Sequence, residues 1–282
     1  MHYTLNIRGR LMDLSRPVVM GILNVTPDSF YAASRAGSEE AIAARARQIA
    51  AEGGAIIDVG ACSTRPDSTP VGEEDEMVRL RLALPIVRRE VPDAVISVDT
   101  FRPSVARMVV EELGADIIND VVGEASKLCN VVGEASKLCN GIRPMLRTVA
   151  ELRVPYILMA SQPTLHDTLL FFAKEVEQLR SLGHKDIILD PGFGFGKTVE
   201  QNYALLAQME RLAVMELPVL VGISRKSMIY KPLGITPEEA LNGTTALHAI
   251  ALSKGASILR VHDVRETVQT VCLNNMLRSN KS

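Results

Sequence analysis

Short apolar runs rich in Val, Ile and Leu recur along the chain, and a longer amphipathic stretch follows each of them. Runs that are apolar on both faces are typical of parallel strands covered by helices. We predict eight such strands, at 18–23, 56–59, 95–98, 116–118, 156–159, 186–189, 219–222 and 257–259. We predict helices between and after them at 39–51, 73–90, 103–113, 165–182, 199–212, 237–254 and 264–277, with an ambiguous helical stretch at 124–152.

The strict alternation of strand and helix predicts an α/β protein with the (β/α)8 TIM-barrel fold. A doubly wound open sheet is the alternative. About 35 residues per unit and the absence of a Gly-x-Gly-x-x-Gly fingerprint after the first strand favour the closed barrel. Residues 1–16 are interpreted as an N-terminal hairpin or plug. Residues 17–282 are interpreted as one barrel domain, because no linker or change of composition within them indicates a second domain.

One segment interrupts the alternation. Residues 121–130 and 131–140 carry the same sequence, Val-Val-Gly-Glu-Ala-Ser-Lys-Leu-Cys-Asn, in tandem. A recent duplication or a copied insertion is favoured over a functional extension, because a repeat fold needs at least about three units. A glycine in each copy disfavours a regular helix, so we predict a loop or a frayed helix here.

Composition excludes several classes of function. The chain has 282 residues, a net charge of −2 and a pI near 6.2, so it lacks the positive field that holds nucleic acid or an anionic membrane. The apolar runs are far shorter than the roughly 18 residues of a transmembrane helix. Because no signal peptide is visible and the four cysteines lack CxxC spacing, we expect a cytoplasmic protein with free thiols.

Polar residues follow seven of the eight predicted strands. A single Asp or Asn in such a place is more often a helix cap or a turn residue. In a barrel, however, all carboxyl ends of the strands meet at one rim, where active sites form. The residues concerned are Asn24, Asp28, Asp58, Asp99, Asn119, Asp190, Lys226, Arg260 and His262, and Arg65 adds a cation after the second strand.

These side chains divide by chemistry. Asp99, Asn119 and Asp190 can accept hydrogen bonds from the N–H groups of a flat heterocycle. Lys226 and Arg260, with His262, come from the last two strand ends, where barrels commonly bind phosphate. The rim is therefore expected to bind a polar ring at one end and an anion at the other.

Three further motifs lack the context that their usual functions need. The segment 192–198 resembles a P-loop, but Pro191 stands where the first glycine is required, so nucleotide triphosphate binding is rejected. The glycosylation sequons at Asn24 and Asn242 have no meaning in a chain that is not secreted. His166, His184 and His248 lack metal spacing, and we interpret them as surface or helix residues.

The strand-end motifs resemble those of dihydropteroate synthase, the folate-pathway enzyme family targeted by sulfonamides. The resemblance runs in order from near the N-terminus to the last helix. Its motifs are Gly-Ile-Leu-Asn-Val-Thr-Pro-Asp-Ser-Phe at 21–30, Ser-Thr-Arg-Pro at 63–66, Ser-Val-Asp-Thr at 97–100, Ile-Asn-Asp at 118–120, Leu-Asp-Pro-Gly-Phe-Gly-Phe at 189–195, Ser-Arg-Lys-Ser at 224–227 and Arg-Val-His at 260–262.

The resemblance implies an enzyme that joins 7,8-dihydropterin-6-ylmethyl diphosphate to p-aminobenzoate with release of pyrophosphate, using Mg²⁺, in a homodimer formed through C-terminal helices. It assigns catalysis to Lys226, Arg260, Asp28 and Arg65, and binding of the metal to Asn24. It assigns the pterin to Asp99, Asn119, Asp190, Lys226, Met159, Phe195 and Gly222. It assigns the diphosphate to Asn24, Arg260, His262 and Arg65, and p-aminobenzoate to Phe30, Ser63, Thr64, Pro66 and Ser227.

The chain departs from the family pattern at three places. Ala32 replaces a carboxylate, and the tandem repeat replaces a Ser-Gly-Gly turn. After Met159, the residues Ala-Ser-Gln-Pro at 160–163 stand where the family has His-x-Arg/Gln-Gly. Two alternatives stay open on these grounds. One is a pterin-binding variant of the family without the synthase step. The other is a folate-dependent methyltransferase barrel.

Overall fold

The computed structural model describes residues 3–25, 35–62, 71–121 and 142–280. The strands are β1 Thr4–Ile7, β2 Arg10–Asp13, β3 Val18–Asn24, β4 Ile56–Gly60, β5 Val95–Asp99, β6 Ile117–Asp120, β7 Tyr156–Met159, β8 Ile187–Asp190, β9 Val219–Val221 and β10 Ala256–Val261. The helices are α1 Arg35–Ala51, α2 Glu73–Glu90, α3 Pro103–Glu111, α5 Pro144–Leu152, α6 Leu165–Ser181, α7 Val199–Ala207, the 3-10 helix η2 Met209–Met215, α8 Ser227–Leu233, α9 Leu241–Ser253 and α10 Val264–Ser279.

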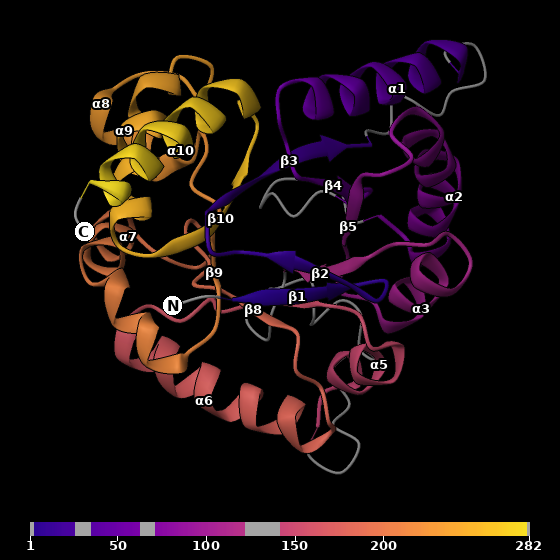
Figure 1. Ribbon diagram of the computed structural model, residues 1–282, viewed down its shortest axis with the longest axis horizontal. Helices are drawn as coiled ribbons and strands as arrows, with labels where there is room; N and C mark the ends of the chain where they lie inside the picture. The colour runs from indigo at the N-terminus through magenta and orange to yellow at the C-terminus, as the bar shows by residue number, and fades with distance from the viewer. Residues whose placement is uncertain (1–2, 26–34, 63–70, 122–141, 281–282) are drawn as a thin grey trace.

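Eight parallel strands form a closed barrel. Their order around it is β10-β3-β4-β5-β6-β7-β8-β9, so that the last strand pairs with the first of the barrel. The helices surround this ring (Figure 1). The predicted TIM barrel is confirmed, and the open doubly wound sheet is wrong because β10 pairs with β3 in parallel register from Ile258 and Val18 onward.

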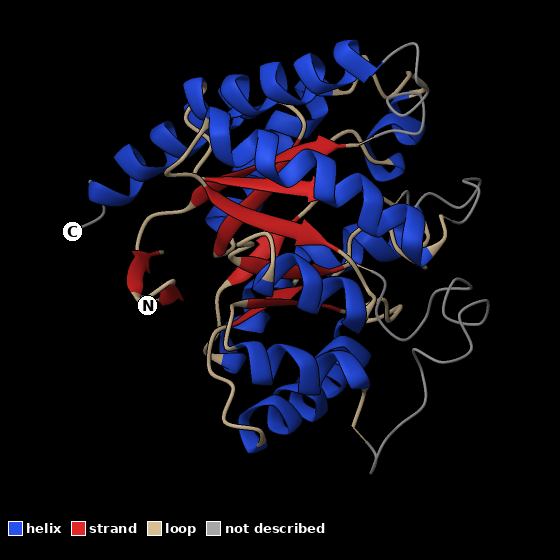
Figure 2. Cartoon of the chain, turned by 90° about the vertical axis from the view of Figure 1, so that its right-hand side faces the viewer, coloured by secondary structure: helices blue, strands red, loops and turns tan. Residues whose placement is uncertain are grey.

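The predicted N-terminal hairpin is present as the antiparallel pair β1–β2. It lies at the end of the barrel from which the parallel strands begin (Figures 1 and 2). Leu5, Ile7 and Leu14 pack there with one inward-facing residue from each of seven barrel strands, in one buried cluster. The hairpin therefore closes the amino-terminal end of the barrel with apolar side chains. Those seven residues are Met20, Ile56, Ile117, Ile157, Ile188, Leu220 and Ile258.

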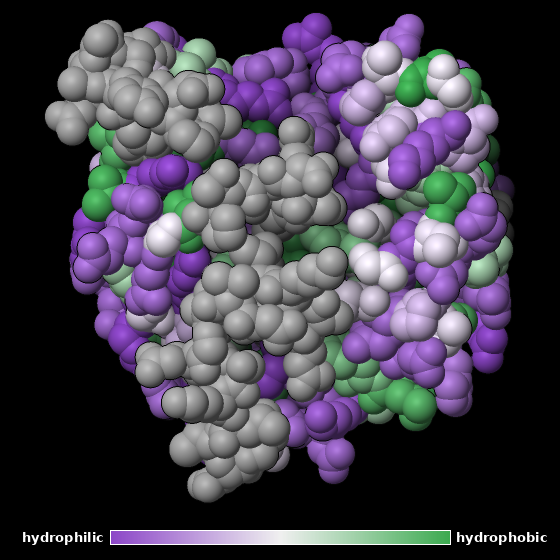
Figure 3. All heavy atoms as spheres, turned by 180° about the vertical axis from the view of Figure 1, so that it is seen from behind, coloured by the Kyte–Doolittle hydropathy of each residue, from purple (hydrophilic) through white to green (hydrophobic). Residues whose placement is uncertain are grey.

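A second, larger core lies between the barrel and its helices, and it contains the outward-facing strand residues, such as Val59 and Val98. Among the described residues visible in Figure 3, hydrophilic ones predominate. Among the described helices, none combines the length and the apolar character that a membrane span requires.

Three predicted helices differ in the structure. The segment 199–212 divides into α7 and η2, and α9 begins at Leu241 instead of residue 237. In the ambiguous stretch 124–152, α5 occupies the last part, whereas the tandem repeat lies outside the described residues except for Val121, which is buried. A further helix, α8, follows β9. The helical pattern does not predict it, because Pro232 interrupts that pattern.

Candidate active site

The polar rim arises from the two-residue period of the strands. On four strands, an apolar residue of the plug layer is followed two positions later by a polar one: Ile56 by Asp58, Ile117 by Asn119, Ile188 by Asp190 and Ile258 by Arg260. Side chains two residues apart lie on the same face of a strand. The sequence therefore places a polar layer directly above the apolar layer, inside the barrel and toward the carboxyl ends of its strands.

Arg260 connects two of these carboxylates. Its Nε donates to Asp58 Oδ2 at 2.7 Å, and its Nη2 donates to Asp99 Oδ2 at 3.0 Å. Burial raises the pKa of Asp99 well above its usual value, the Arg260 guanidinium opposes that rise, and Asp58 adds to it. A pair of buried carboxylates thus shares one guanidinium, and the proton affinity of Asp99 is increased.

Two acceptors in this cluster have no partner among the described residues. Asn119 Nδ2 donates to Asp58 Oδ2 at 3.1 Å, but Asn119 Oδ1 and Asp58 Oδ1 are buried without a hydrogen bond. A buried polar atom without a partner costs about 1–3 kcal/mol. The structure therefore contains a pair of acceptors suited to N–H donors of a ligand.

Lys226 and Asp190 form the opposite side of the same layer. Burial lowers the pKa of Lys226 to about 7, although the nearby Asp190 carboxylate favours the ammonium. Burial raises the pKa of Asp190, which also accepts a hydrogen bond from Gly192 N at 2.8 Å. Lys226 Nζ donates to the carbonyl of Phe193 and lies 4.4 Å from the centre of the Phe195 ring.

The glycine-rich loop after β8 holds this lysine. Gly192 has φ +68°, and a Cβ there would lie 1.9 Å from the Ala160 carbonyl oxygen. At Gly194, with φ +80°, a Cβ would lie 2.8 Å from Lys226 Cδ. The P-loop-like run therefore serves close packing against the loop after β7 and against Lys226. Lys197 fastens the loop by donating to the Gly192 carbonyl at 3.0 Å.

The other predicted ring-site residues lie in the same layer. Met159 ends β7 and is 1% exposed. Gly222 directly follows β9, and a Cβ there would lie 3.9 Å from Lys226 Nζ. The structure thus brings Met159, Gly222 and Phe195 to the layer formed by Asp190, Lys226 and Arg260.

The predicted anion end is formed by β3, β9 and β10. Asn24 is the exposed last residue of β3, and its Oδ1 would lie 3.3 Å from a Cβ built on Gly60 at the end of β4. His262 follows β10, and its Nδ1 lies 3.1 Å from Ser224 Oγ. Burial and the neighbouring Arg260 lower the pKa of His262 to about 4, so its imidazole is neutral at pH 7.

The remaining predicted site residues belong to the segments around this rim. Ser227 begins α8, directly after Lys226. Asp28, Phe30, Ser63, Thr64, Arg65 and Pro66 lie outside the described residues, as does Ala32. Within the part of the chain that is described, no three His, Cys, Asp or Glu side chains are arranged to hold a metal ion.

Asp58 is the site residue whose role the sequence does not reveal. Its position marks it as a strand-end residue, but the motifs assign no binding function to it. In the structure it is fully buried and accepts from both Arg260 and Asn119. Its place two residues after Ile56, matching Asn119 after Ile117, is the signal that could have found it.

The interpretation as surface or helix residues is confirmed for His166 and for His248, which lies on α9, and is wrong for His184, which is buried between α6 and β8. His184 is 5% exposed and His248 is 1% exposed, whereas His166 is exposed on α6. Burial lowers the pKa of His248 to about 4 and also lowers that of His184. Both are buried side chains outside the polar layer.

The chain matches known proteins along most of its length. The family model described as a pterin binding enzyme matches residues 20–262. The dihydropteroate synthase of Escherichia coli strain K12 is 37% identical over 281 residues, covering 94% of this chain and 93% of the relative. A solved Xanthomonas albilineans dihydropteroate synthase with 4-aminobenzoic acid has a TM-score of 0.83 at 36% identity, covering 99% of both chains. A Yersinia pestis dihydropteroate synthase with a sulfonamide drug has a TM-score of 0.82 at 36% identity, covering 99% of this chain and all of that one.

Proposed function

Because the chain belongs to the dihydropteroate synthase family of pterin-binding enzymes, we propose that its rim joins 7,8-dihydropterin-6-ylmethyl diphosphate to p-aminobenzoate, with Asp58 among the residues that bind the pterin. The observation that carries the residue assignment is the pair of unpartnered acceptors, Asn119 Oδ1 and Asp58 Oδ1, beside Asp99 and Asp190. A pterin edge presents the N–H donors that such acceptors need.

The pterin ring would occupy the polar layer. Asn119, Asp58 and Asp190 accept from its N–H groups, and Lys226 donates to its ring edge. Met159 packs on a ring face. A neutral ring suits this site, because the carboxylates Asp58 and Asp99 are already bridged by Arg260. A charged ligand would upset that balance in a buried setting.

The diphosphate would lie toward Asn24, Arg260 and His262. In the reaction the C–O bond between the pterin methylene and the diphosphate breaks, and its electron pair leaves with the pyrophosphate. The amine nitrogen of p-aminobenzoate bonds to the methylene carbon and loses one proton. The cations Arg260 and Lys226 stabilise the charge that develops on the leaving group.

Mg²⁺ is part of the proposal. The amide oxygen of Asn24 fits it, because Mg²⁺ prefers hard oxygen ligands and is often held by one or two protein groups together with substrate phosphates. When bound, the ion would neutralise part of the charge on the diphosphate. We expect chelation by EDTA to abolish turnover while a pterin without diphosphate still binds, as measured by calorimetry; unchanged turnover in EDTA would contradict a metal requirement.

The activity is tested with purified protein, Mg²⁺, the pterin diphosphate and p-aminobenzoate. Pyrophosphate is expected to form in step with dihydropteroate. Omission of p-aminobenzoate is the control, because any pyrophosphate released then reports hydrolysis. Release no faster than the background would rule out the synthase activity.

A pterin-binding protein without turnover is the second candidate. The residues Ala160, Ser161, Gln162 and Pro163, which replace the family's usual residues after β7, favour it. Calorimetry with the pterin diphosphate distinguishes the two, since binding without product would support this candidate. The methyltransferase alternative receives no support from the named relatives.

A homodimer is proposed from the exposed apolar side chains of α10. Leu273, Met276 and Leu277 on that helix are 65%, 61% and 67% exposed, and such a group on a surface helix is typical of an interface. We expect sedimentation to give twice the monomer mass, and the double change Leu273→Glu with Leu277→Glu to give monomers. A wild-type monomer at micromolar concentration would exclude the dimer.

The cytoplasm is proposed as the location. Of the described cysteines, Cys62 and Cys272 are both free thiols, as expected in a reducing compartment. Fractionation of cells with an antibody to the chain tests this.

A further inference from the structure

The turn after β9 places Lys226 through an uncommon backbone conformation. Arg225 has φ 55°, in the left-handed region that non-glycine residues rarely adopt. The turn is closed by a hydrogen bond from Lys226 N to the Ile223 carbonyl at 3.1 Å. A strained conformation of this kind persists only where surrounding contacts stabilise it. The contacts of Arg225 therefore also fix the position of the next residue, Lys226.

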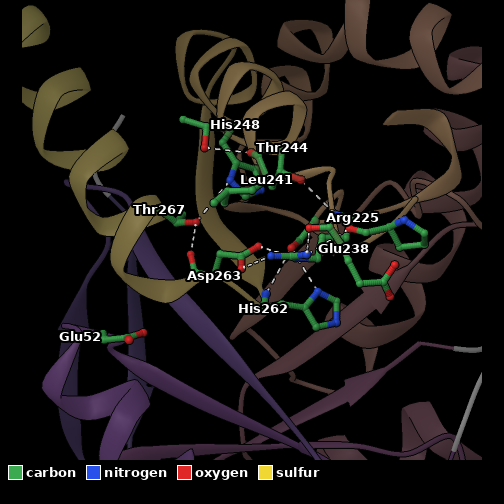
Figure 4. Close-up of polar contacts among 12 residues, drawn as sticks. Glu52, Arg225, Glu238, Leu241, Thr244, His248, His262, Asp263 and Thr267 are labelled. Atoms are coloured by element: carbon green, nitrogen blue, oxygen red, sulfur yellow. Dashed lines mark hydrogen bonds and ion pairs between the residues drawn. The ribbon is translucent and has the colours of Figure 1, made fainter. Parts of the chain in front are cut away.

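The Arg225 side chain joins three segments (Figure 4). Its Nε and Nη2 donate to Asp263 Oδ2 and Oδ1 at 2.8 and 2.7 Å. Its Nη1 donates to the carbonyls of Pro237 and Glu238 at 3.1 and 2.6 Å. The Arg225 backbone N–H adds a bond to Thr244 Oγ1 of α9 at 3.1 Å. We call Arg225 and Asp263 the loop clamp.

Asp263 makes an unusual use of its carboxylate. It is the N-cap residue of α10, where an Asp normally accepts from the first turn of its own helix. Within the described α10 no such side-chain bond forms, and both Asp263 oxygens accept from Arg225 instead. Asp263 thus forms a bidentate ion pair between the loops after β9 and β10 in place of a helix cap, and bidentate Arg–carboxylate pairs are among the strongest charge-assisted hydrogen bonds.

The clamp lies between two residues of the anion end. Lys226 directly follows Arg225, and His262 directly precedes Asp263. The backbone of His262 is held further by Arg45 Nη2, which donates to its carbonyl at 2.7 Å. Two contacts therefore join the β9 and β10 loops near Lys226 and His262. One is the ion pair, and the other is Ser224 Oγ, which lies 3.1 Å from His262 Nδ1 and accepts from His262 N at 3.2 Å.

We propose that Arg225 and Asp263 are positioning residues, which hold Lys226 and His262 at the spacing that binds the diphosphate of the substrate. This inference rests on the proposed function of the rim. It does not involve contact of the clamp with the substrate. The acceptors proposed for the pterin edge, Asp58, Asn119 and Asp190, stand on strands β4, β6 and β8, which the clamp does not join. Of the groups proposed to contact the pterin edge, only Lys226 depends on the clamp.

The test compares two probes by calorimetry: pyrophosphate with Mg²⁺, and the neutral pterin alcohol that lacks the diphosphate. We expect Arg225→Gln and Asp263→Asn to weaken pyrophosphate binding at least tenfold and pterin binding by a clearly smaller factor, because the pterin loses only its contact with Lys226. Arg225→Lys should resemble Arg225→Gln, because one ammonium cannot replace a fork that reaches a carboxylate and two carbonyls. The double variant should lose no more than either single variant.

Arg225→Gly separates side chain from backbone, because glycine adopts the left-handed conformation freely. It should remain folded and still lose the pyrophosphate affinity. Lys254→Gln is the matched control, since it removes an ion pair with Glu210 at 2.6 Å together with a bond to the Ala207 carbonyl, both remote from the rim. It should leave the affinity for both probes unchanged.

Full pyrophosphate affinity in Arg225→Gly, or an equal loss for both probes in the folded variants, would overturn the positioning role. The proposed function fails in a different way. In that case the wild-type chain itself binds neither probe, which removes the basis for the clamp as well.

Discussion

At the scale of single residues, burial tunes the groups that the barrel brings together. Lys226 and Asp190 are both displaced toward their neutral forms by burial, and each opposes the displacement of the other. A lysine with a pKa of about 7 changes its charge within the physiological range. If Lys226 binds the substrate as proposed, we expect substrate binding to depend on pH in this range.

Lys226 supplies the first prediction. Lys226→Ala should cost on the order of 3 kcal/mol of transition-state stabilisation, which is a loss of about 160-fold in kcat/KM. Because the ammonium is the form that contacts the leaving group, wild-type kcat/KM should fall as pH rises through about 7. Lys226→Arg should keep its charge and lose that fall. A wild-type profile that is flat from pH 6 to pH 9 would contradict the assignment.

His248 supplies a prediction about stability. Burial lowers its pKa to about 4 in the folded chain, from an ordinary value of 6.5, so between these values the unfolded chain binds a proton that the folded chain does not. Stability is therefore lost as pH falls below 6.5. His248→Asn should reduce the loss between pH 7 and pH 5 by about 2 kcal/mol, measured by urea unfolding at both pH values. His166→Asn, at an exposed site, should change nothing.

At the scale of elements, the loop after β8 depends on close contact with the loop after β7. Gly192 and Gly194 have a left-handed backbone conformation, and other atoms occupy the space that a side chain at either position would need. The sequence pattern alone indicates only a failed nucleotide-binding motif, because the loop packs against Ala160 and Lys226, which are distant in sequence. For the same reason the sequence marks Arg225 only as part of a motif: Asp263 lies 38 residues away.

Gly192→Ala tests this loop. Both its φ of +68° and a Cβ at 1.9 Å from the Ala160 carbonyl oppose alanine. The positive φ alone should cost about 1 kcal/mol of stability. Because the added Cβ also meets the Ala160 carbonyl, we expect a larger loss of stability and weaker pterin binding. Gly183→Ala is the matched control, since it has φ +80° and no described atom within 4 Å of the added Cβ. Equal losses in the two variants, measured by urea unfolding, would mean that the Ala160 contact has no effect.

At the scale of the whole molecule, the barrel is closed at one end and polar at the other. The hairpin β1–β2 covers the apolar layer, and the functional layer lies two residues further along the strands. Because the two layers adjoin, the plug stabilises the platform from which Asp58, Asn119 and Asp190 project. Loss of the hairpin packing should lower the stability of the fold more than the activity of the folded protein.

Leu5→Ala tests the plug. Leu5 is 1% exposed beneath the barrel, and truncation of such a residue costs about 2–5 kcal/mol. Leu11→Ala, in the same hairpin but 74% exposed, should change stability by less than about 0.5 kcal/mol. Urea unfolding of both variants measures the difference; equal effects would show that the hairpin does not contribute to the core.

The sequence by itself determined the barrel and most of the rim, because both depend on local patterns. Apolar runs with a polar residue after them predict a parallel strand and a functional end, and the order of Asp99, Asn119, Asp190 and Arg260 could be read directly. Only the tertiary structure decided which of these groups are paired. The Asp58–Arg260 contact spans 202 residues, and Lys226, whose pKa is lowered by burial, contacts the Phe193 carbonyl 33 residues away. Pairing and burial depend on contacts between residues far apart in the sequence, which form only when the barrel closes, so no local sequence pattern predicts them.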